Sequence, residues 1–356
     1  MYLSILPVAL FLSGFARFVK DRIRFIVVFL ILQIMGLVLA LDSSMTDYSS
    51  YSEHFTKVPN ISEILTDPKS FSRAYGEPAF VGLQVLAKSL GLDYVIFRVI
   101  FYSLMMAFNA IFFLKFKSYF VFIFFWYFAF FYHNDGNIMR TAFSSTLFML
   151  GVFHLGHKKT YVSLAYFIAA SLFHYTAIIF IGVYVAFFLN FGRWFVIFSL
   201  LLSLMFGFFG VGRSLLVWIT SYSELSFIIF DKIYRYANYN LSPEAGVVRF
   251  ITVVPMALIL LVFVKYNLVI RNRLDRQWLV VFSLSVCFLF IFSDFRLFAD
   301  RIFTLMGMAG GALLVASFKA FNSRSLLAYQ LSWLILLLIF SVYKYFNYNW
   351  VLVSLS

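Results

Sequence analysis

Several arginines and a histidine stand at the ends of long apolar stretches of this sequence. Arg140 follows the polar turn 133–137, His174 lies between two apolar stretches, and Arg249 opens another. An ionisable side chain within or at the mouth of an apolar helix costs free energy, so each is a candidate for function. Arginine suits phosphate oxygens, because its planar guanidinium donates two parallel hydrogen bonds and keeps its charge. These residues predict a cavity that holds a pyrophosphate group.

A second group of charges lies at one late turn, where Arg296, Asp300 and Arg301 follow an apolar stretch. They extend the predicted cavity as substrate-binding residues. Arg296 and Asp300 are four residues apart, however, which is also the spacing of an ion pair on one helix face. The residues alone leave both interpretations open.

Carboxylates and aromatic side chains accompany the arginines. Asp47 and Tyr51 follow an early apolar stretch, and Glu77 stands directly before Pro78. Carboxylates and aromatic rings beside a phosphate site suit a sugar, since aromatic faces stack on sugar rings. The alternative for Glu77 is that it only fixes a loop.

Arg140 and His174 also have structural interpretations. Arg140 could extend its stem toward water or bond Asp135. His174 could be a buried packing residue that forms hydrogen bonds.

Other kinds of site are not indicated by the sequence. His and Cys residues show no metal-ligand spacing, and neither a glycine-rich nucleotide loop nor a Gly-x-Ser-x-Gly turn occurs. We therefore expect no metal and no cofactor. The net charge of +13 comes from basic residues scattered singly between apolar stretches. This scatter indicates membrane topology signals, so no nucleic-acid partner is expected.

The composition requires a membrane around these residues. Hydrophobic residues make up 63% of the 356 positions, charged residues make up 12%, and the mean hydropathy is +0.94. So few charges cannot cover the surface of a soluble domain of this length. A spanning helix needs about 20 apolar residues, and the stretches here approach that length. The sequence predicts an all-α, polytopic integral membrane protein forming a single transmembrane domain over residues 1–356.

About twelve transmembrane helices are predicted, and the first is expected to be retained rather than cleaved as a signal peptide. Their ranges are 1–16, 25–41, 94–114, 119–133, 138–154, 160–174, 175–190, 194–211, 247–265, 278–294, 301–318 and 326–345. The apolar segment 78–91 contains Lys88 and ends at a Gly-Leu-Asp break, so it is predicted to be interfacial or re-entrant.

Basic residues in the short loops predict the orientation, because they favour the cytoplasmic face. They are Arg17, Lys20, Arg22, Arg24, Lys115, Lys117, Lys158, Lys159, Arg193, the cations of 265–276, Lys319 and Arg324. All lie on one face if twelve helices span the membrane with both termini outside. Two long loops, about 42–77 and 212–246, then face the periplasm of a bacterial inner membrane.

Four short segments, taken in order, resemble the EpsG/Wzy-like family of bacterial surface polysaccharide polymerases. They are Asp47-Tyr48-Ser49-Ser50-Tyr51, Glu77-Pro78-Ala79-Phe80, Asn137-Ile138-Met139-Arg140-Thr141-Ala142 and Phe173-His174-Tyr175-Thr176-Ala177. They cover roughly residues 40–180. Beyond them, only a late arginine, Arg296 or Arg301, supports the resemblance.

The resemblance implies an O-antigen polymerase, a glycosyltransferase acting on the periplasmic face. It would join oligosaccharide repeat units carried on undecaprenyl pyrophosphate. Its other expected partners are membrane lipids and a chain-length regulator protein. Arg140 would stabilise the leaving pyrophosphate, and His174, Asp47 or Glu77 would accept the acceptor's proton. The competing functions are a lipid-linked oligosaccharide flippase and a related membrane O-antigen ligase, glycosyltransferase or acyltransferase.

Overall fold

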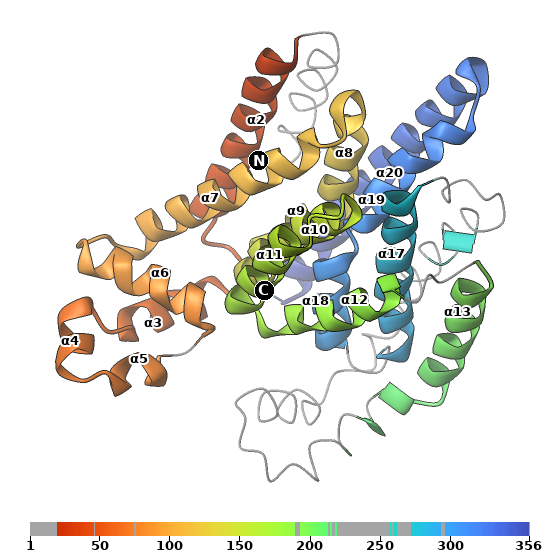
Figure 1. Cartoon of the computed structure of the whole chain (residues 1–356). Coiled ribbons are helices and arrows are strands. Elements are labelled where there is room, and N and C mark those ends of the chain that lie inside the picture. Colours follow the sequence, from red (N-terminus) through yellow and green to blue (C-terminus); the bar gives the residue numbers. More distant parts are fainter. Residues whose placement is uncertain are drawn as a thin grey trace. The chain divides into compact units, whose positions relative to one another are not determined.

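The computed structural model describes most of the chain as helices (Figure 1). The described residues are 20–45, 47–74, 76–188, 193–212, 272–292 and 296–355, with a few single residues or pairs between 214 and 261. Every regular element among them is helical. The chain forms two compact units, residues 1–150, 168–174 and 322–356 in the first and residues 151–167 and 175–321 in the second.

Ten of the described helices lie wholly or mainly in the first unit. They are α2 (Asp21–Leu41), α3 (Tyr48–Lys57), α4 (Ile61–Thr66), α5 (Lys69–Arg73), α6 (Pro78–Ser89), α7 (Tyr94–Leu114), α8 (Phe120–Phe130), α9 (Tyr132–Asp135), α10 (Met139–Gly156) and α20 (Ser323–Leu355). α10 and α11 (Thr160–Phe173) each contribute to both units.

Helices α2 and α7 pack side by side in opposite directions (Figure 1). The Gln33 amide donates to the carbonyl of Ser103 (3.0 Å), and Arg98 donates to the carbonyl of Leu39 (2.7 Å). At Gly36 the backbones approach closely, because a Cβ there would lie 3.2 Å from the carbonyl oxygen of Tyr102. Small residues permit such contact between membrane helices. The α2–α7 pair is therefore closely packed and joined by hydrogen bonds within the first unit.

Helices α8 and α10 are deeply buried. Nearly every residue of α8 is buried, as is every residue of α10 from Met139 to Val152. α8 is apolar all round, and such a helix belongs inside a larger helical body or within a membrane. The 33-residue helix α20 packs against α8, where the rings of Phe130 and Phe340 lie 4.6 Å apart.

The predicted loop 42–77 contains three short helices, α3, α4 and α5, which gather with α6 at one end of α7 (Figure 1). Val58, Val81 and Val85 form a small buried cluster there, against Ile64 and Phe71. The Asn60 and Glu63 side chains cap the start of α4 reciprocally. The segment is therefore folded onto α6.

The second unit is built around α17 (Arg273–Ile291). α12 (Phe180–Phe188), α13 (Arg193–Phe208), α18 (Arg296–Met306) and α19 (Ala309–Ser317) all contact it. Asn272 caps α17 by accepting from the backbone N–H of Asp275 (2.8 Å). The buried Asp275 carboxylate pairs with Lys319 (2.9 Å), which fixes the same end of the helix.

Four helices among the described residues are long and apolar enough to cross a membrane: Asp21–Leu41, Tyr94–Leu114, Arg273–Ile291 and Ser325–Val342. The chain is thus an all-α membrane protein. Shorter apolar helices cover 120–130, 160–173, 175–188 and 194–208. At 12 residues, or about 18 Å, α6 is too short to span a bilayer. Twelve spans remain a prediction. The predicted spans 1–16 and 247–265 and the predicted loop 212–246 lie wholly or largely outside the described residues.

The predicted span 301–318 is not one straight helix. The chain bends by 44° between α18 and α19, and a fifth span results only if this bent pair is counted as one. Gly307 stands at the break, and Gly310 and Gly311 follow it. Glycine is poor at propagating a helix, so three glycines in five positions explain why the apolar stretch divides here.

Candidate functional site

Arg140 forms a buried ion pair with Glu77. It is the second residue of α10, only 6% of it is exposed, and its Nη1 donates to the Glu77 carboxylate. The Glu77 side chain is 2% exposed. Two charges so deeply buried depend on each other, because removing either leaves the other without compensation. Asp135, the other partner considered for Arg140, accepts a hydrogen bond from the Tyr127 hydroxyl (2.6 Å).

Local backbone geometry explains how Glu77 reaches Arg140. Glu77 precedes α6 in an extended conformation, and its side chain does not cap the helix. Gly76 before it has φ +142°, a conformation that side chains rarely allow. Pro78 then starts α6 with its fixed φ. The Gly-Glu-Pro sequence thus directs the carboxylate away from its own helix and toward α10.

Aromatic side chains complete the surroundings of the guanidinium. Nε of Arg140 donates to the Tyr51 hydroxyl at 3.4 Å, a long hydrogen bond. The carbon of the guanidinium lies 5.6 Å from the ring centroids of both Tyr51 and Phe80. Such positions over aromatic faces stabilise a cation. The structure therefore brings three predicted site residues, Arg140, Glu77 and Tyr51, into contact. We use the name Arg140 cluster for these three residues together with Phe80 and with His54, which is described next.

His54 belongs to this cluster but was not predicted from the sequence. It lies three residues after Tyr51 on α3, on the same helix face, and is partly exposed. Burial lowers the pKa of His54, and the nearby charge of Arg140 lowers it further, whereas Glu53 acts in the opposite direction. The imidazole therefore favours its neutral form, which can accept a proton.

The lowered pKa of His54 predicts acid sensitivity. The unfolded chain binds this proton near pH 6.5, while the folded protein binds it only at lower pH. The contribution of His54 to stability is thus fully present above about pH 6.5 and is lost as the pH falls toward the folded pKa. Between about pH 7.5 and 5.5 we expect the wild-type melting temperature in detergent to fall more than that of His54→Gln. His157→Gln, at an exposed histidine, is the control and should follow the wild type; equal falls in wild type and His54→Gln would contradict this.

The cluster lies at one end of the antiparallel α2–α7 pair. Phe80 packs edge-on against Phe97 and Phe101 in the first two turns of α7, at centroid distances of 5.9 and 5.5 Å. Since α2 and α7 are both long enough to span a bilayer, their ends mark its faces. The Arg140 cluster is therefore at a membrane face.

His174 lies at the same end of α10 as Arg140. The Ser144 hydroxyl donates to the carbonyl of Ala170 (2.8 Å), and the rings of Phe143 and Phe173 lie 4.5 Å apart. Ser144 is one turn after Arg140, and Ala170 is one turn before His174. Because α10 and α11 run in opposite directions, Arg140 and His174 share one end of the pair. His174 is 5% exposed and follows the last residue of α11.

The other predicted site residues occupy different places. Asp47 is half-buried one turn before Tyr51, at the start of α3. Arg296, Asp300 and Arg301 lie on α18 in the second unit, where Asp300 is exposed and Arg301 partly buried. The Arg296 side chain and Arg249 lie outside the described part of the chain.

Arg98 is a buried cation that the sequence analysis missed. It is 1% exposed, donates to the carbonyls of Leu39 (2.7 Å) and Asp42 (3.1 Å), and lies 4.6 Å from the Tyr48 ring centroid. The last carbonyls of a helix lack hydrogen-bond donors within the helix, and the Arg98 guanidinium donates to two carbonyls at the end of α2. Its function is therefore to join α2, α3 and α7.

The Arg140 cluster offers three chemical functions in one place: a cation for oxyanions, a carboxylate that orients it, and a titratable imidazole. Among the described residues, no group of three or more His, Cys, Asp or Glu side chains is arranged to hold a metal ion. The cluster thus combines a guanidinium, which suits an oxyanion, with an imidazole that can accept a proton.

Comparison with known proteins places this arrangement in a family. The model of the EpsG family matches residues 6–353 of the chain. No curated protein and no solved structure matches the chain.

Proposed function

Because the chain belongs to the EpsG family, we propose that it is an O-antigen or related surface polysaccharide polymerase of the bacterial inner membrane. Membership of the family indicates a polysaccharide polymerase-like function and an enzyme of glycosyltransferase type. The nature of the glycan, its undecaprenyl pyrophosphate carrier and a chain-length regulator as partner are our proposal. The observation that supports it is the buried Arg140–Glu77 ion pair beside one end of the α2–α7 pair.

The distribution of charge supports a periplasmic position for the cluster. Lys20, Arg22 and Arg24 lie at the start of α2, and Lys115 and Lys117 follow the end of α7. These two ends lie together, because the helices are antiparallel. Basic residues favour the cytoplasmic face. The Arg140 cluster is at the opposite end of the same pair, and this placement supports the proposed periplasmic orientation.

The reaction proposed is a displacement at the anomeric carbon of the donor glycan. The acceptor hydroxyl forms the new glycosidic bond, the bond to the pyrophosphate oxygen breaks, and undecaprenyl pyrophosphate leaves. Arg140 stabilises the negative charge that develops on the leaving group, and Glu77 holds the guanidinium in position. Arginines fixed before the reaction stabilise charge more strongly than water does.

A proton must leave the acceptor hydroxyl as it attacks. His174 and Asp47 are candidates predicted from the sequence, and His54 is added by the structure. Glu77 is the weaker candidate for this base, since its carboxylate already forms an ion pair with Arg140. Arg296 or Arg301 on α18, with Arg249 and Asp300, remain proposed as further ligands of the pyrophosphate and sugar.

The experiment that tests the function is a chromosomal deletion of the gene. We expect the deletion strain to carry one repeat unit on its lipopolysaccharide core in place of the wild-type ladder, and a plasmid copy to restore the ladder. A core without any repeat unit would indicate a ligase instead. Accumulation of lipid-linked repeat units on the cytoplasmic side would indicate a flippase.

A further inference from the structure

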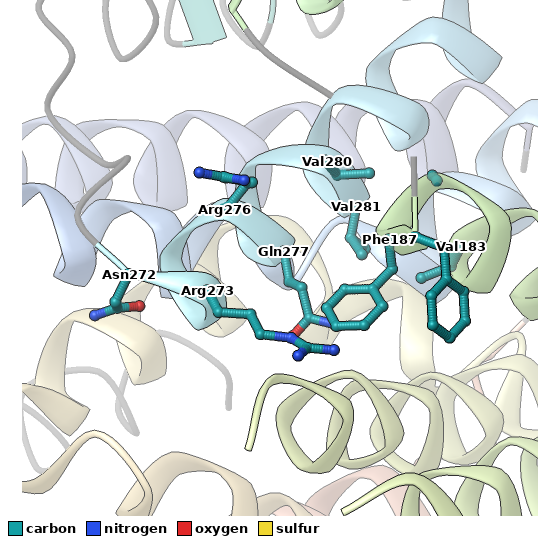
Figure 2. Close-up of a pocket in the computed structure, with 10 residues that line it drawn as sticks. Val183, Phe187, Asn272, Arg273, Arg276, Gln277, Val280 and Val281 are labelled. Atoms are coloured by element: carbon teal, nitrogen blue, oxygen red, sulfur yellow. The ribbon is translucent and has the colours of Figure 1, made fainter. Parts of the chain in front are cut away.

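A pocket of about 520 Å³ lies between α12 and α17 in the second unit, remote in sequence from the Arg140 cluster. Its polar end is formed by the start of α17, and its walls are formed by apolar residues of both helices (Figure 2). A volume of this size is typical of a small-molecule site. The proposed polymerase reaction makes no use of it.

The polar end of the pocket contains an unsatisfied amide. Gln277 is 4% exposed, and neither atom of its amide has a hydrogen-bond partner within the described part of the protein. Figure 2 shows the Gln277 and Arg273 side chains pointing to the same place beside Phe187. The Arg273 guanidinium carbon is 3.9 Å from the Phe187 ring centroid. A buried polar group without a partner costs about 1–3 kcal/mol, so a ligand that accepts its hydrogen bonds is favoured.

The surroundings of the polar end are basic. A Cβ on Gly156 would lie 2.5 Å from Oε1 of Gln277, so the end of α10 abuts the pocket, and the exposed Lys158 and Lys159 follow directly. These two lysines follow the contact with Gln277, and their positive charge together with that of Arg273 attracts an anion to this end. A donor amide and a guanidinium fork are the groups that bind phosphate oxygens.

The opposite end of the pocket is apolar and borders the outer surface of α12. Val183, Val280 and Val281 line it. On the same helix Ile181 is 54% exposed and Val185 is 53% exposed, and side chains so apolar and exposed on a membrane protein face lipid. The pocket therefore joins a phosphate-binding end to a lipid-facing side.

We propose that this pocket binds an anionic membrane phospholipid, with its phosphodiester at Arg273 and Gln277 and the first carbons of an acyl chain along the valines. Basic pockets between transmembrane helices are a common form of lipid-headgroup site. The ligand stabilises the start of α17 and leaves the reaction at the Arg140 cluster unchanged.

The test uses the purified full-length protein in a neutral detergent. Phosphatidylglycerol and phosphatidylcholine with the same acyl chains are titrated separately, and binding is followed by native mass spectrometry and by the melting temperature. We expect phosphatidylglycerol to bind and raise the melting temperature, and phosphatidylcholine to bind at least about fivefold more weakly. Arg273→Gln should weaken phosphatidylglycerol binding about five- to tenfold.

Gln277→Leu separates binding from folding. Because the amide has no partner in the protein, the variant should keep the melting temperature measured without lipid but lose most of the rise caused by phosphatidylglycerol. Arg22→Gln, which removes one exposed cation from α2 in the first unit, is the matched control and should bind like wild type. Equal binding of both lipids, or equal effects of Arg273→Gln and Arg22→Gln, would overturn the proposal. Inorganic phosphate that competes fully with phosphatidylglycerol would also overturn it, because the site would then select free phosphate rather than lipid.

Discussion

Arg140→Ala is expected to abolish the polysaccharide ladder and leave single repeat units. Removing one preorganised donor to a developing oxyanion lowers turnover by about 10²–10³-fold. Arg140→Lys should recover only part of the ladder, because a lysine keeps the charge but not the two-pronged geometry. The measurement is the lipopolysaccharide ladder of a deletion strain that carries each variant, with protein levels determined by immunoblot. A wild-type ladder in Arg140→Ala would remove this residue from the site.

Arg98→Lys is the matched control for this experiment. Both arginines are buried in the first unit, but Arg98 binds backbone carbonyls, whereas Arg140 binds a carboxylate. We expect Arg98→Lys to lower the melting temperature and yet to preserve the ladder at permissive temperature. If both variants lost the ladder in proportion to their protein levels, the effect of Arg140 would be one of folding.

Glu77→Leu is expected to cause the largest loss of stability among single substitutions in the cluster. It leaves the Arg140 guanidinium buried without its counter-charge, which costs about 3–5 kcal/mol. The polymer ladder should be lost as well, because the guanidinium is no longer held. Thermal unfolding of the purified protein measures the first effect. Glu53→Gln, at an exposed carboxylate of α3, is the control and should melt like wild type.

The double variant Arg140→Met/Glu77→Leu distinguishes the two functions of the ion pair. Well-packed apolar residues often replace a buried ion pair without loss of stability. We therefore expect the double variant to melt close to wild type and still to produce no ladder. Recovery of both stability and polymerisation would mean that the pair only holds the fold.

The sequence predicted the long helices well, because their apolar stretches approach the length that a bilayer requires. The predicted range 94–114 matches α7, and the predicted range 25–41 ends with α2, which begins four residues earlier. It did not predict α3, α4 and α5, which have five to ten residues each and mixed polarity. A periodic pattern cannot be recognised over so few residues. It also did not predict the bend at Gly307, since the stretch remains apolar through it.

The candidate site could be predicted only as separate residues. Arg140 and Glu77 are 63 positions apart, and one sequence contains nothing that pairs them. His54 was detectable in principle, because it lies three residues from Tyr51 on a helical face, but only once α3 is known to be a helix. Arg98 was hidden for another reason: it stands inside an apolar stretch, and its partners are backbone carbonyls, which no side-chain motif records.

The length of α20 limits how this helix can sit in a bilayer. Its 33 residues extend for about 50 Å, while the hydrocarbon core is about 30 Å thick. The apolar window Ser325–Val342 fills that core, so the later turns of α20 extend beyond it at one membrane face. A helix longer than the core tilts or projects from it. Because α8 packs against α20, any tilt of α20 must be shared by the α8 surface in contact with it.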